Sequence, residues 1–482
     1  MLCDIEASAR AQRTVAQFKV RASSANLSLR EFAAKQSLKA SLIRAPEPKL
    51  GFRLHSAAHN SNHKCDDDLN GDPMTVNFSI ALGPFLEARK RWMRVANLAV
   101  PALMLLSISS ASAQTKTLPQ QTAALNAPPV ASATTIRPPS QDYLVYVVCE
   151  SADKVVLVRF GPKGLQKEHE TQIGLMPMDI NGPHGIAVSP DKKYLYVSVG
   201  HGRPDGSVWK LKTGTDEVIR FAPLGLFPAT TDISLDGAFI YVANANFHGD
   251  MVPSSISVVA TDEMAEVKRI TTCTMPHGSR LNPQGTKHYS ACMMDDMLVE
   301  IDTQTFEVSR HFLLGAGKEM GMTGAPDKQM KMSDLTCVPT WAQPSNDGSE
   351  IYVACNKAND IVAVDATSWK MLRRFPAGTG VYNLAMTQDG RLIATNKRGQ
   401  SVSIFDPKTG KELAKLATKR KIVHGAVVTP DNRYAFISVE GIGSDPGTVE
   451  VIDLSSLTTV ATLDVPQQAA GIDFWKTEPS KP

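Results

Sequence analysis

The chain has 482 residues, of which 43% are hydrophobic and 21% are charged. This composition is ordinary for a globular protein and excludes wholesale disorder and collagen-like structure, and the length alone would allow about three domains. Residues 1–113 carry a surplus of six positive charges, whereas the remainder has a net charge of −3. A nearly neutral body excludes a general nucleic-acid binder, because such a protein needs a basic surface.

A secretory signal is predicted at about residues 85–113. Basic residues at positions 89–94 precede an apolar run over 95–108, and the small-residue cleavage site Ala111-Ser112-Ala113 follows. The alternative is a membrane anchor, but the run is shorter than the ~20 apolar residues that a membrane span requires. We therefore expect cleavage after Ala113, a periplasmic or secreted mature protein, and no membrane span after cleavage.

The residues on either side of this signal are not expected to join a folded domain. A signal of this kind starts near an N-terminus, so residues 1–113 are interpreted as an extension plus signal, with translation starting at Met74 or Met93. Residues 114–142 are rich in Ala, Pro, Thr and Gln, which is typical of a flexible linker.

The rest of the chain is built from a repeat. Each unit has an apolar strand, a turn of the Asp-Gly type, a second strand and two further strands. Six full units start at Pro183, Pro228, Pro276, Pro339, Val381 and Val423. Spacings of roughly 40–60 residues with four short strands per unit are typical of propeller blades.

A seventh unit is split between the two ends of this region. Its inner strand is expected near residues 470–475, and its outer strands at 143–149, at 154–160 and before residue 176. Joining both ends in one blade closes the ring and removes a free sheet edge. The sequence thus predicts an all-β fold, one seven-bladed β-propeller of four-stranded antiparallel blades over residues 143–476, instead of three domains.

A strand motif carries a family resemblance. Tyr146-Val-Val-Cys149, Tyr241-Val-Ala-Asn244 and Tyr352-Val-Ala-Cys355 resemble the repeat of the YVTN β-propeller family, and the resemblance covers essentially the whole mature chain. It implies the fold but no single function, because the family includes haem-binding propellers of nitrite reductases, quinoprotein amine dehydrogenase heavy-chain-like proteins, lactonases and scaffolds without chemistry. The sequence contains no Cys-x-x-Cys-His motif, so covalent haem has no support.

The second residue of each unit is expected at the mouth of the central channel. His184, His277 and His424 hold this position in the first, third and sixth units, which divides the ring almost evenly. Three imidazoles facing one another across a channel would suit a metal ion, for which imidazole is the commonest ligand. Alternatively, each histidine is a turn residue that bonds to a neighbouring blade.

The loop after each YVTN-like strand is expected on the same face as these histidines. Two such loops carry His201 and His248, and a third carries Cys292 and Met293. These residues are further candidate ligands. Buried free cysteine is the alternative explanation for the cysteines that end these strands.

The mature chain has five cysteines, so a secreted form leaves at least one thiol unpaired. Cys273 and Cys337 precede the inner strands of adjacent blades. We expect these two to form the disulfide.

Methionines are concentrated in one part of the chain. Of 14 methionines after the signal, 12 lie between Met176 and Met332, and the pairs Met320-x-Met322 and Met330-x-Met332 flank a polar insertion. A thioether is a soft ligand that selects Cu(I). The alternative is a flexible apolar lid, because methionine fills irregular gaps.

The primary hypothesis is therefore a copper-binding propeller with a redox or metal-handling role. Its candidate ligands are His184, His277, His424, His201, His248, Cys292, Met293, Met320 and Met322. The partner is expected to be a small molecule, a metal ion or a periplasmic protein, and not a nucleic acid.

Two alternatives remain open. Pro183-His184 followed by Ser189-Pro190-Asp191 resembles the lactonase and muconate-cycloisomerase branch of seven-bladed propellers, which implies a hydrolase or isomerase using His184. Arg280, Glu319 and Glu440 are candidate companions of that histidine, although their spacing does not fix them. The third possibility is a metal-free binding scaffold.

Overall fold

A computed structural model describes residues 138–175, 180–201, 206–324 and 330–480. The predicted extension, the signal and the linker up to residue 137 lie outside these residues, as do Met176 and Met178. Among the described residues, no helix is long and apolar enough to cross a membrane. The only helical turns among them are η1 (Glu150–Ala152) and η2 (Met332–Asp334).

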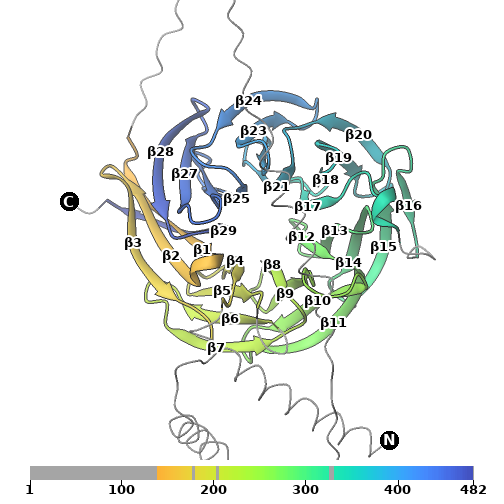
Figure 1. The fold of residues 1–482 in the computed structure, drawn as a ribbon, viewed down its shortest axis with the longest axis horizontal. Helices are drawn as coiled ribbons and strands as arrows, with labels where there is room; N and C mark the ends of the chain where they lie inside the picture. Colours follow the sequence, from red (N-terminus) through yellow and green to blue (C-terminus); the bar gives the residue numbers. More distant parts are fainter. Residues whose placement is uncertain (1–137, 176–179, 202–205, 325–329, 481–482) are drawn as a thin grey trace, which may run out of the picture. The chain divides into compact units, whose positions relative to one another are not determined.

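Seven antiparallel sheets form the blades of a ring (Figure 1). The inner strands are β4 (Pro183–Val188), β8 (Pro228–Ile233), β12 (Pro276–Leu281), β17 (Pro339–Pro344), β21 (Val381–Met386), β25 (Val423–Val428) and β29 (Ala469–Pro479). The second strands are β5 (Tyr194–Val199), β9 (Phe239–Asn244), β13 (Lys287–Cys292), β18 (Glu350–Cys355), β22 (Leu392–Asn396), β26 (Tyr434–Val439) and β1 (Gln141–Cys149).

The two outer layers complete each blade. The third strands are β6 (Ser207–Lys212), β10 (Pro253–Ala260), β14 (Met297–Asp302), β19 (Asp360–Asp365), β23 (Ser401–Asp406), β27 (Gly447–Asp453) and β2 (Lys154–Gly161). The outermost strands are β7 (Val218–Pro223), β11 (Ala265–Thr274), β15 (Glu307–Leu313), β20 (Met371–Pro376), β24 (Lys411–Ala417), β28 (Thr458–Val465) and β3 (Gly164–Gln172). One blade adds a fifth strand, β16 (Met320–Met322), outside β15.

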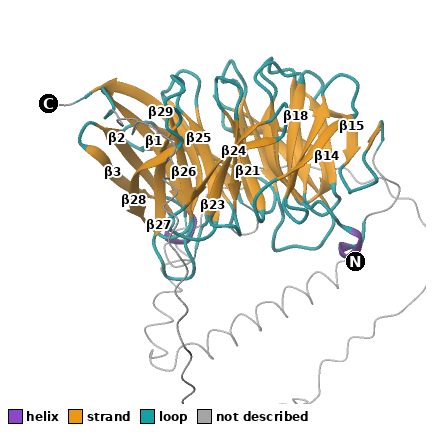
Figure 2. Ribbon diagram, turned by 90° about the horizontal axis from the view of Figure 1, so that it is seen from above, coloured by secondary structure: helices purple, strands orange, loops and turns teal. Residues whose placement is uncertain are grey.

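This architecture confirms the predicted fold class. All six predicted unit starts, from Pro183 to Val423, are the first residues of inner strands. The second and third strands are almost wholly buried, because apolar side chains on both of their faces pack against the neighbouring blades. The sheets stand side by side around the axis, and loops project from both faces of the ring (Figure 2).

The ring is closed as predicted by a blade that combines both ends of the propeller. Its strand order is β29-β1-β2-β3, so the last strand lies innermost and the first strand pairs with it. Gln141 is the register partner of Pro479, and Cys149 is that of Ala469. The neighbouring blades pack on both faces of this sheet and form two of the apolar clusters of the core.

Adjacent inner strands approach closely at the residue after the mouth position. A Cβ on Gly185 would lie 2.0 Å from the carbonyl oxygen of Ala229 in the next inner strand, so this position requires glycine. The Gly185 N–H donates to Ser198 Oγ (2.7 Å), whose hydroxyl donates to the Ala229 carbonyl (2.5 Å). Ser198 in β5 thus links its own inner strand to that of the next blade.

The same link recurs in two other blades. Ser438 bridges the Gly425 N–H and the Ala470 carbonyl, and Thr395 bridges Asn383 and the His424 carbonyl. The histidine-glycine pairs in the sequence therefore arise partly from packing, because Gly425, like Gly185, faces a neighbouring backbone carbonyl.

The disulfides differ from the predicted pairing. Cys273 is bonded to Cys292 and Cys337 to Cys355, whereas Cys149 is free and buried, so the expected Cys273–Cys337 bond is wrong. Each disulfide joins a residue shortly before an inner strand to the last residue of the second strand that pairs with this inner strand. These two places are adjacent because the hairpin register pairs Pro276 with Cys292 in one blade and Pro339 with Cys355 in the other. Cys273 itself lies in β11, the outermost strand of the preceding blade, so its disulfide also joins two neighbouring blades.

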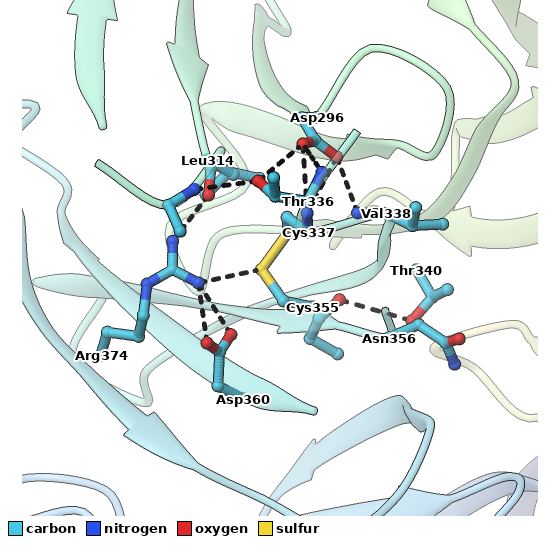
Figure 3. Close-up of a disulfide and its surroundings, with 12 residues drawn as sticks. Asp296, Leu314, Thr336, Cys337, Val338, Thr340, Cys355, Asn356, Asp360 and Arg374 are labelled. Carbon is cyan, nitrogen blue, oxygen red and sulfur yellow. Dashed lines mark hydrogen bonds and ion pairs between the residues drawn. A yellow bond between two sulfur atoms is a disulfide. The ribbon is translucent and has the colours of Figure 1, made fainter. Parts of the chain in front are cut away.

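Side-chain contacts around the Cys337–Cys355 disulfide fix the loops next to it (Figure 3). The Asp296 carboxylate accepts hydrogen bonds from the backbone N–H groups of Thr336, Cys337 and Val338. The Arg374 guanidinium lies 3.8 Å from Cys355 Sγ and pairs with Asp360. Neighbouring blades are thereby tied together where the chain enters the inner strand.

Candidate functional site

A cavity of about 530 Å³ opens at the mouth of the central channel. Its walls come from the starts of inner strands and from the loops that follow second strands, so the two predicted sets of residues do share one face. The lining residues are Glu150, His184, Phe227, Phe247, His248, Met293, Thr340, Asn356, Tyr382, Lys397, Arg398, Ile422, Glu440 and Gln468. We call this cavity the mouth cavity.

The three mouth histidines lie close together, and of the three His184 lines this cavity. The ring centroid of His184 lies 5.8 Å from that of His277 and 5.2 Å from that of His424. Tyr382, which holds the same repeat position in another blade, lies 4.9 Å from His424, centroid to centroid. These four rings form a buried aromatic layer across the channel.

Both ring nitrogens of His277 are engaged. Nδ1 lies 3.0 Å from the Thr340 carbonyl, to which it donates, and Nε2 therefore accepts from the Tyr382 hydroxyl at 3.0 Å. Burial, with a further contribution from His184, lowers the pKa of His277 to about 3. This imidazole is neutral near pH 7 and has no nitrogen left for a ligand unless Tyr382 moves.

His184 differs because one of its nitrogens is free. Nδ1 lies 2.8 Å from Glu150 Oε2, and Nε2 is buried with no hydrogen-bond partner among the residues that the structure describes. Burial raises the pKa of Glu150, but His184 and Lys397 outweigh it and the net pKa is lowered. The Glu150 carboxylate accepts from Nδ1–H, so Nε2 is the ring nitrogen that can accept a proton.

A charged pair forms the opposite wall. Lys397 Nζ lies 2.7 Å from Glu440 Oε1 and 4.1 Å from the centroid of the Tyr382 ring. Burial lowers the pKa of Lys397, but Tyr382, Glu440 and Glu150 raise it, so the net pKa lies above its ordinary value. Arg398, exposed at the rim, donates to the side chain and carbonyl of Asn356 and pairs with no carboxylate in the described part of the chain.

His424 lies between this charged pair and the other histidines. Its Nε2 is 3.8 Å from Glu440 Oε1. Burial, followed by the positive charge of Lys397 and by the neighbouring imidazoles of His184 and His277, lowers the pKa of His424 well below its ordinary value. His424 is therefore a neutral member of the layer.

The remaining wall is aromatic. Phe227 and Phe247 lie 4.7 Å apart, centroid to centroid, and Phe227 contacts His248 at 5.3 Å. His201 does not line the mouth cavity but stacks on His248 at 5.1 Å. Burial and His248 lower the pKa of His201. The cavity thus combines one apolar wall with one charged wall.

The predicted sulfur ligands are not gathered at the histidines. Met293 lines the mouth cavity, but Cys292 is bonded to Cys273 and therefore offers no thiolate. Met320 and Met322 lie in β16 at the outer edge of their blade, paired with β15. Within the described residues, no group of three His, Cys, Asp or Glu is placed to hold a metal ion.

Of the predicted companions of His184, only Glu440 lines the mouth cavity. Arg280 lines the channel behind the histidine layer. Glu319 pairs with Arg374 in the neighbourhood of the Cys337–Cys355 disulfide.

Sequence reasoning missed Glu150, Lys397, Arg398 and the two phenylalanines. One signal was available, because the residue directly after each YVTN-like strand is a repeat position of its own. Five of its seven members line the mouth cavity, namely Glu150, Met293, Asn356, Lys397 and Glu440. The sequence-based prediction used the last residue of each YVTN-like strand, whereas the residue that follows it is the one that lines the cavity.

No protein-family model matches the chain, and no curated protein does. Among solved structures, a putative 6-phosphogluconolactonase from Bacteroides fragilis is 16% identical, with a TM-score of 0.54 over 70% of this chain and 98% of that one. The periplasmic gluconolactonase of Pseudomonas aeruginosa is 16% identical, with a TM-score of 0.52 over 70% and 99%. Hydrazine synthase of Kuenenia stuttgartiensis is 21% identical, with a TM-score of 0.49 over 62% and 92%. The chain shares its propeller fold with the two lactonase structures.

Proposed function

We propose that the protein is an acid–base enzyme that hydrolyses or isomerises a small lactone in the mouth cavity, with His184 as the general base. The observation that carries this proposal is the Glu150–His184 pair, in which His184 lines the cavity and its Nε2 is buried without a hydrogen-bond partner among the described residues. A carboxylate that holds Nδ1–H fixes the tautomer and orientation of an imidazole that accepts protons through Nε2. The names of the two lactonases agree with this chemistry but do not establish it.

In the hydrolytic reaction, His184 Nε2 takes a proton from a water molecule as the water oxygen attacks the ring carbonyl carbon. The Lys397 ammonium stabilises the negative charge that develops on the carbonyl oxygen. The ring C–O bond then breaks, and the leaving alkoxide takes the proton back from His184. The product is a hydroxy acid, which releases one proton at neutral pH.

The walls of the mouth cavity favour a particular kind of substrate. Arg398 offers a positive charge at the rim that no carboxylate of the described residues pairs with, and this charge would hold an anionic group. Phe227 and Phe247 offer an apolar surface on another wall. We therefore expect a lactone that carries an acidic group and an apolar face.

The test is hydrolysis of a panel of acidic, neutral and sugar lactones, followed in a pH-stat. His184→Gln and Glu150→Gln should each reduce kcat by about 10²–10⁴, because removal of a general base costs that much. His169→Gln, in the outermost strand β3, is the matched control and should retain full activity. Wild-type protein that hydrolyses none of the lactones, or a His184→Gln variant as active as wild type, would exclude the proposal.

Copper binding is a second candidate, favoured by the convergence of His184, His277 and His424. A metal there could use His184 Nε2 directly, but His277 would first have to lose its bond to Tyr382. Titration with Cu(I) and Cu(II) tests it, with His184→Ala, His277→Ala and His424→Ala each expected to weaken binding. Wild-type affinity in all three variants would exclude a shared site, and a protein with neither metal nor activity would be a scaffold.

We also propose a periplasmic or secreted location. The predicted signal before Gln114 supports it, as do the two disulfides, since disulfides persist in oxidising compartments.

A further inference from the structure

A second, smaller cavity lies in the channel behind the histidine layer. Its volume is about 30 Å³, and its lining includes His184 and His424, which separate it from the mouth cavity. Thr231, Arg280, Trp341 and Asn383 line the rest, together with glycines and small apolar side chains of the inner strands. We call it the channel cavity.

Unsatisfied polar atoms gather around this cavity. Six atoms of residues that line it are buried and have no hydrogen-bond partner among the described residues: Thr231 Oγ1, Trp341 Nε1, Asn383 Oδ1, His184 Nε2 and both ring nitrogens of His424. A buried polar atom without a partner costs about 1–3 kcal/mol, and native proteins rarely retain several at one place. Both donors and acceptors are present, so one ligand that can donate and accept would satisfy them together.

The lining argues for a neutral ligand. Arg280 stacks on Trp341 at 4.6 Å and donates to the carbonyls of Ser279 and Thr231, so its guanidinium is already partnered. Asp232 accepts from the Leu281 N–H; burial raises the pKa of its carboxyl, and Arg280 opposes this rise. The volume is that of about two water molecules, since one needs roughly 10–15 Å³ measured in this way.

We propose that the channel cavity binds one or two ordered water molecules that link His184 Nε2 to Trp341, Asn383 and Thr231. This site provides a proton path between the histidine layer and the face of the ring opposite the mouth cavity. That role rests on the proposed function, because lactone hydrolysis releases a proton while the product still occupies the mouth cavity. His184 Nε2 is free again once it has protonated the alkoxide, so it takes the proton of the new carboxylic acid and passes it to the water in the channel cavity.

A high-resolution crystal structure tests the site without reference to activity. Solvent density within hydrogen-bond distance of Trp341 Nε1 and Asn383 Oδ1 is the expected result. The double variant Thr231→Val/Asn383→Leu, which removes two of the partners at nearly constant volume, should lose this density. Thr272→Val is the matched control, because Thr272 Oγ1 is also buried and unpartnered in the described structure but does not line the cavity.

Two results would overturn the water site. One is a wild-type channel without solvent density, and the other is an anomalous peak there in crystals soaked in bromide, which would show an anion site. If the double variant does not fold, Thr231→Val and Asn383→Leu are examined singly, each being expected to lose density at its own partner.

The proton path has its own measurement. Proton release is followed with a pH indicator in stopped flow after mixing with the best lactone substrate, and ring opening is followed separately. Thr231→Val/Asn383→Leu should slow proton release several-fold relative to wild type and to Thr272→Val, with KM unchanged. Equal release rates would exclude the path, and an absence of any lactone hydrolysis would remove it together with the proposed function while the crystal still decides the water site.

Discussion

Single side chains at the same repeat position have different roles in this ring. His277 uses both ring nitrogens within the protein, whereas His184 uses one and keeps the other free. The difference comes from neighbours contributed by other blades, Tyr382 for His277 and Glu150 for His184. A histidine outside the site, His288, has neither nitrogen bonded within the described residues and stacks on Tyr241 at 4.9 Å.

His288 makes the fold sensitive to acid. Burial, and secondarily Arg280, lowers its pKa to about 3, far below the ordinary value of an unfolded chain. The unfolded state therefore binds a proton that the folded state does not, and stability falls as the pH drops from about 6.5 towards 3, by up to about 1.4 kcal/mol per pH unit. His277 adds to this in the same direction.

We predict that His288→Phe, which keeps the stacking on Tyr241, makes stability less dependent on pH. Urea unfolding followed by tryptophan fluorescence at pH 7, 6, 5 and 4 should give a shallower decline than in wild type. Parallel curves for the two proteins would show that His288 titrates normally in the folded state.

At the scale of elements, hydroxyl groups in second strands connect neighbouring blades. Three hydroxyl groups do this, those of Ser198, Thr395 and Ser438. Each accepts a hydrogen bond from a backbone N–H of the inner strand of its own blade and donates one to a backbone carbonyl of the inner strand of the next blade. These contacts add directional bonds between sheets that otherwise meet through apolar side chains. They also set the distance at which the mouth histidines face one another.

Ser198→Ala should lower the free energy of unfolding by about 1–3 kcal/mol, because it leaves the Gly185 N–H and the Ala229 carbonyl buried without a partner. The matched control is Ser290→Ala, since Ser290 Oγ is buried but bonds to nothing within the described residues. That variant should be neutral or slightly stabilised. Equal losses in the two would show that the effect is only lost packing.

For the whole molecule, closure of the ring by β29 and β1 removes the free edges that an open ring would have. We predict that deletion of residues 143–160, which removes most of β1 and β2, causes aggregation instead of a modest loss of stability. Size-exclusion chromatography and thermal unfolding of the deletion variant provide the measurement. A soluble, cooperatively unfolding variant would contradict the role of this blade in closure.

The mature protein is predicted to begin at or near Gln114. N-terminal sequencing of material from the periplasm or the medium checks this. A cytoplasmic protein that retains Arg89 would contradict the location.

Much of the fold could be predicted because its information is local and repeated. Apolar strands and Asp-Gly-type turns recur with one period, so the inner strands begin at the predicted residues. The disulfides were mispredicted because two cysteines at similar repeat positions, Cys273 and Cys337, looked like partners. The hairpin register instead places each of them beside the cysteine that ends the second strand of the blade it precedes. The fifth strand at Met320–Met322 has no counterpart in the repeat.

The site was only partly predictable because its chemistry depends on contacts between blades. Glu150 follows the first strand of the propeller and His184 belongs to the next blade, and only the packing of these two blades and the side-chain geometry join them at 2.8 Å. Charged residues that directly follow a strand are usually solvated. From the sequence alone, Lys397 and Glu440 would therefore be interpreted as solvated side chains. Their burial reveals their part in the cavity.

The pairing of Gln141 with Pro479 has a further consequence. The chain enters and leaves the ring at one spot, so a short peptide could join these residues and new ends could be opened elsewhere without disturbing any blade. The outer hairpin around Lys408 and Thr409, neither of which lines either cavity, offers such a place. A circular permutant opened there should keep its barrier to unfolding. Because the two ends of the ring lie side by side, the whole propeller could also be inserted into a surface loop of another protein.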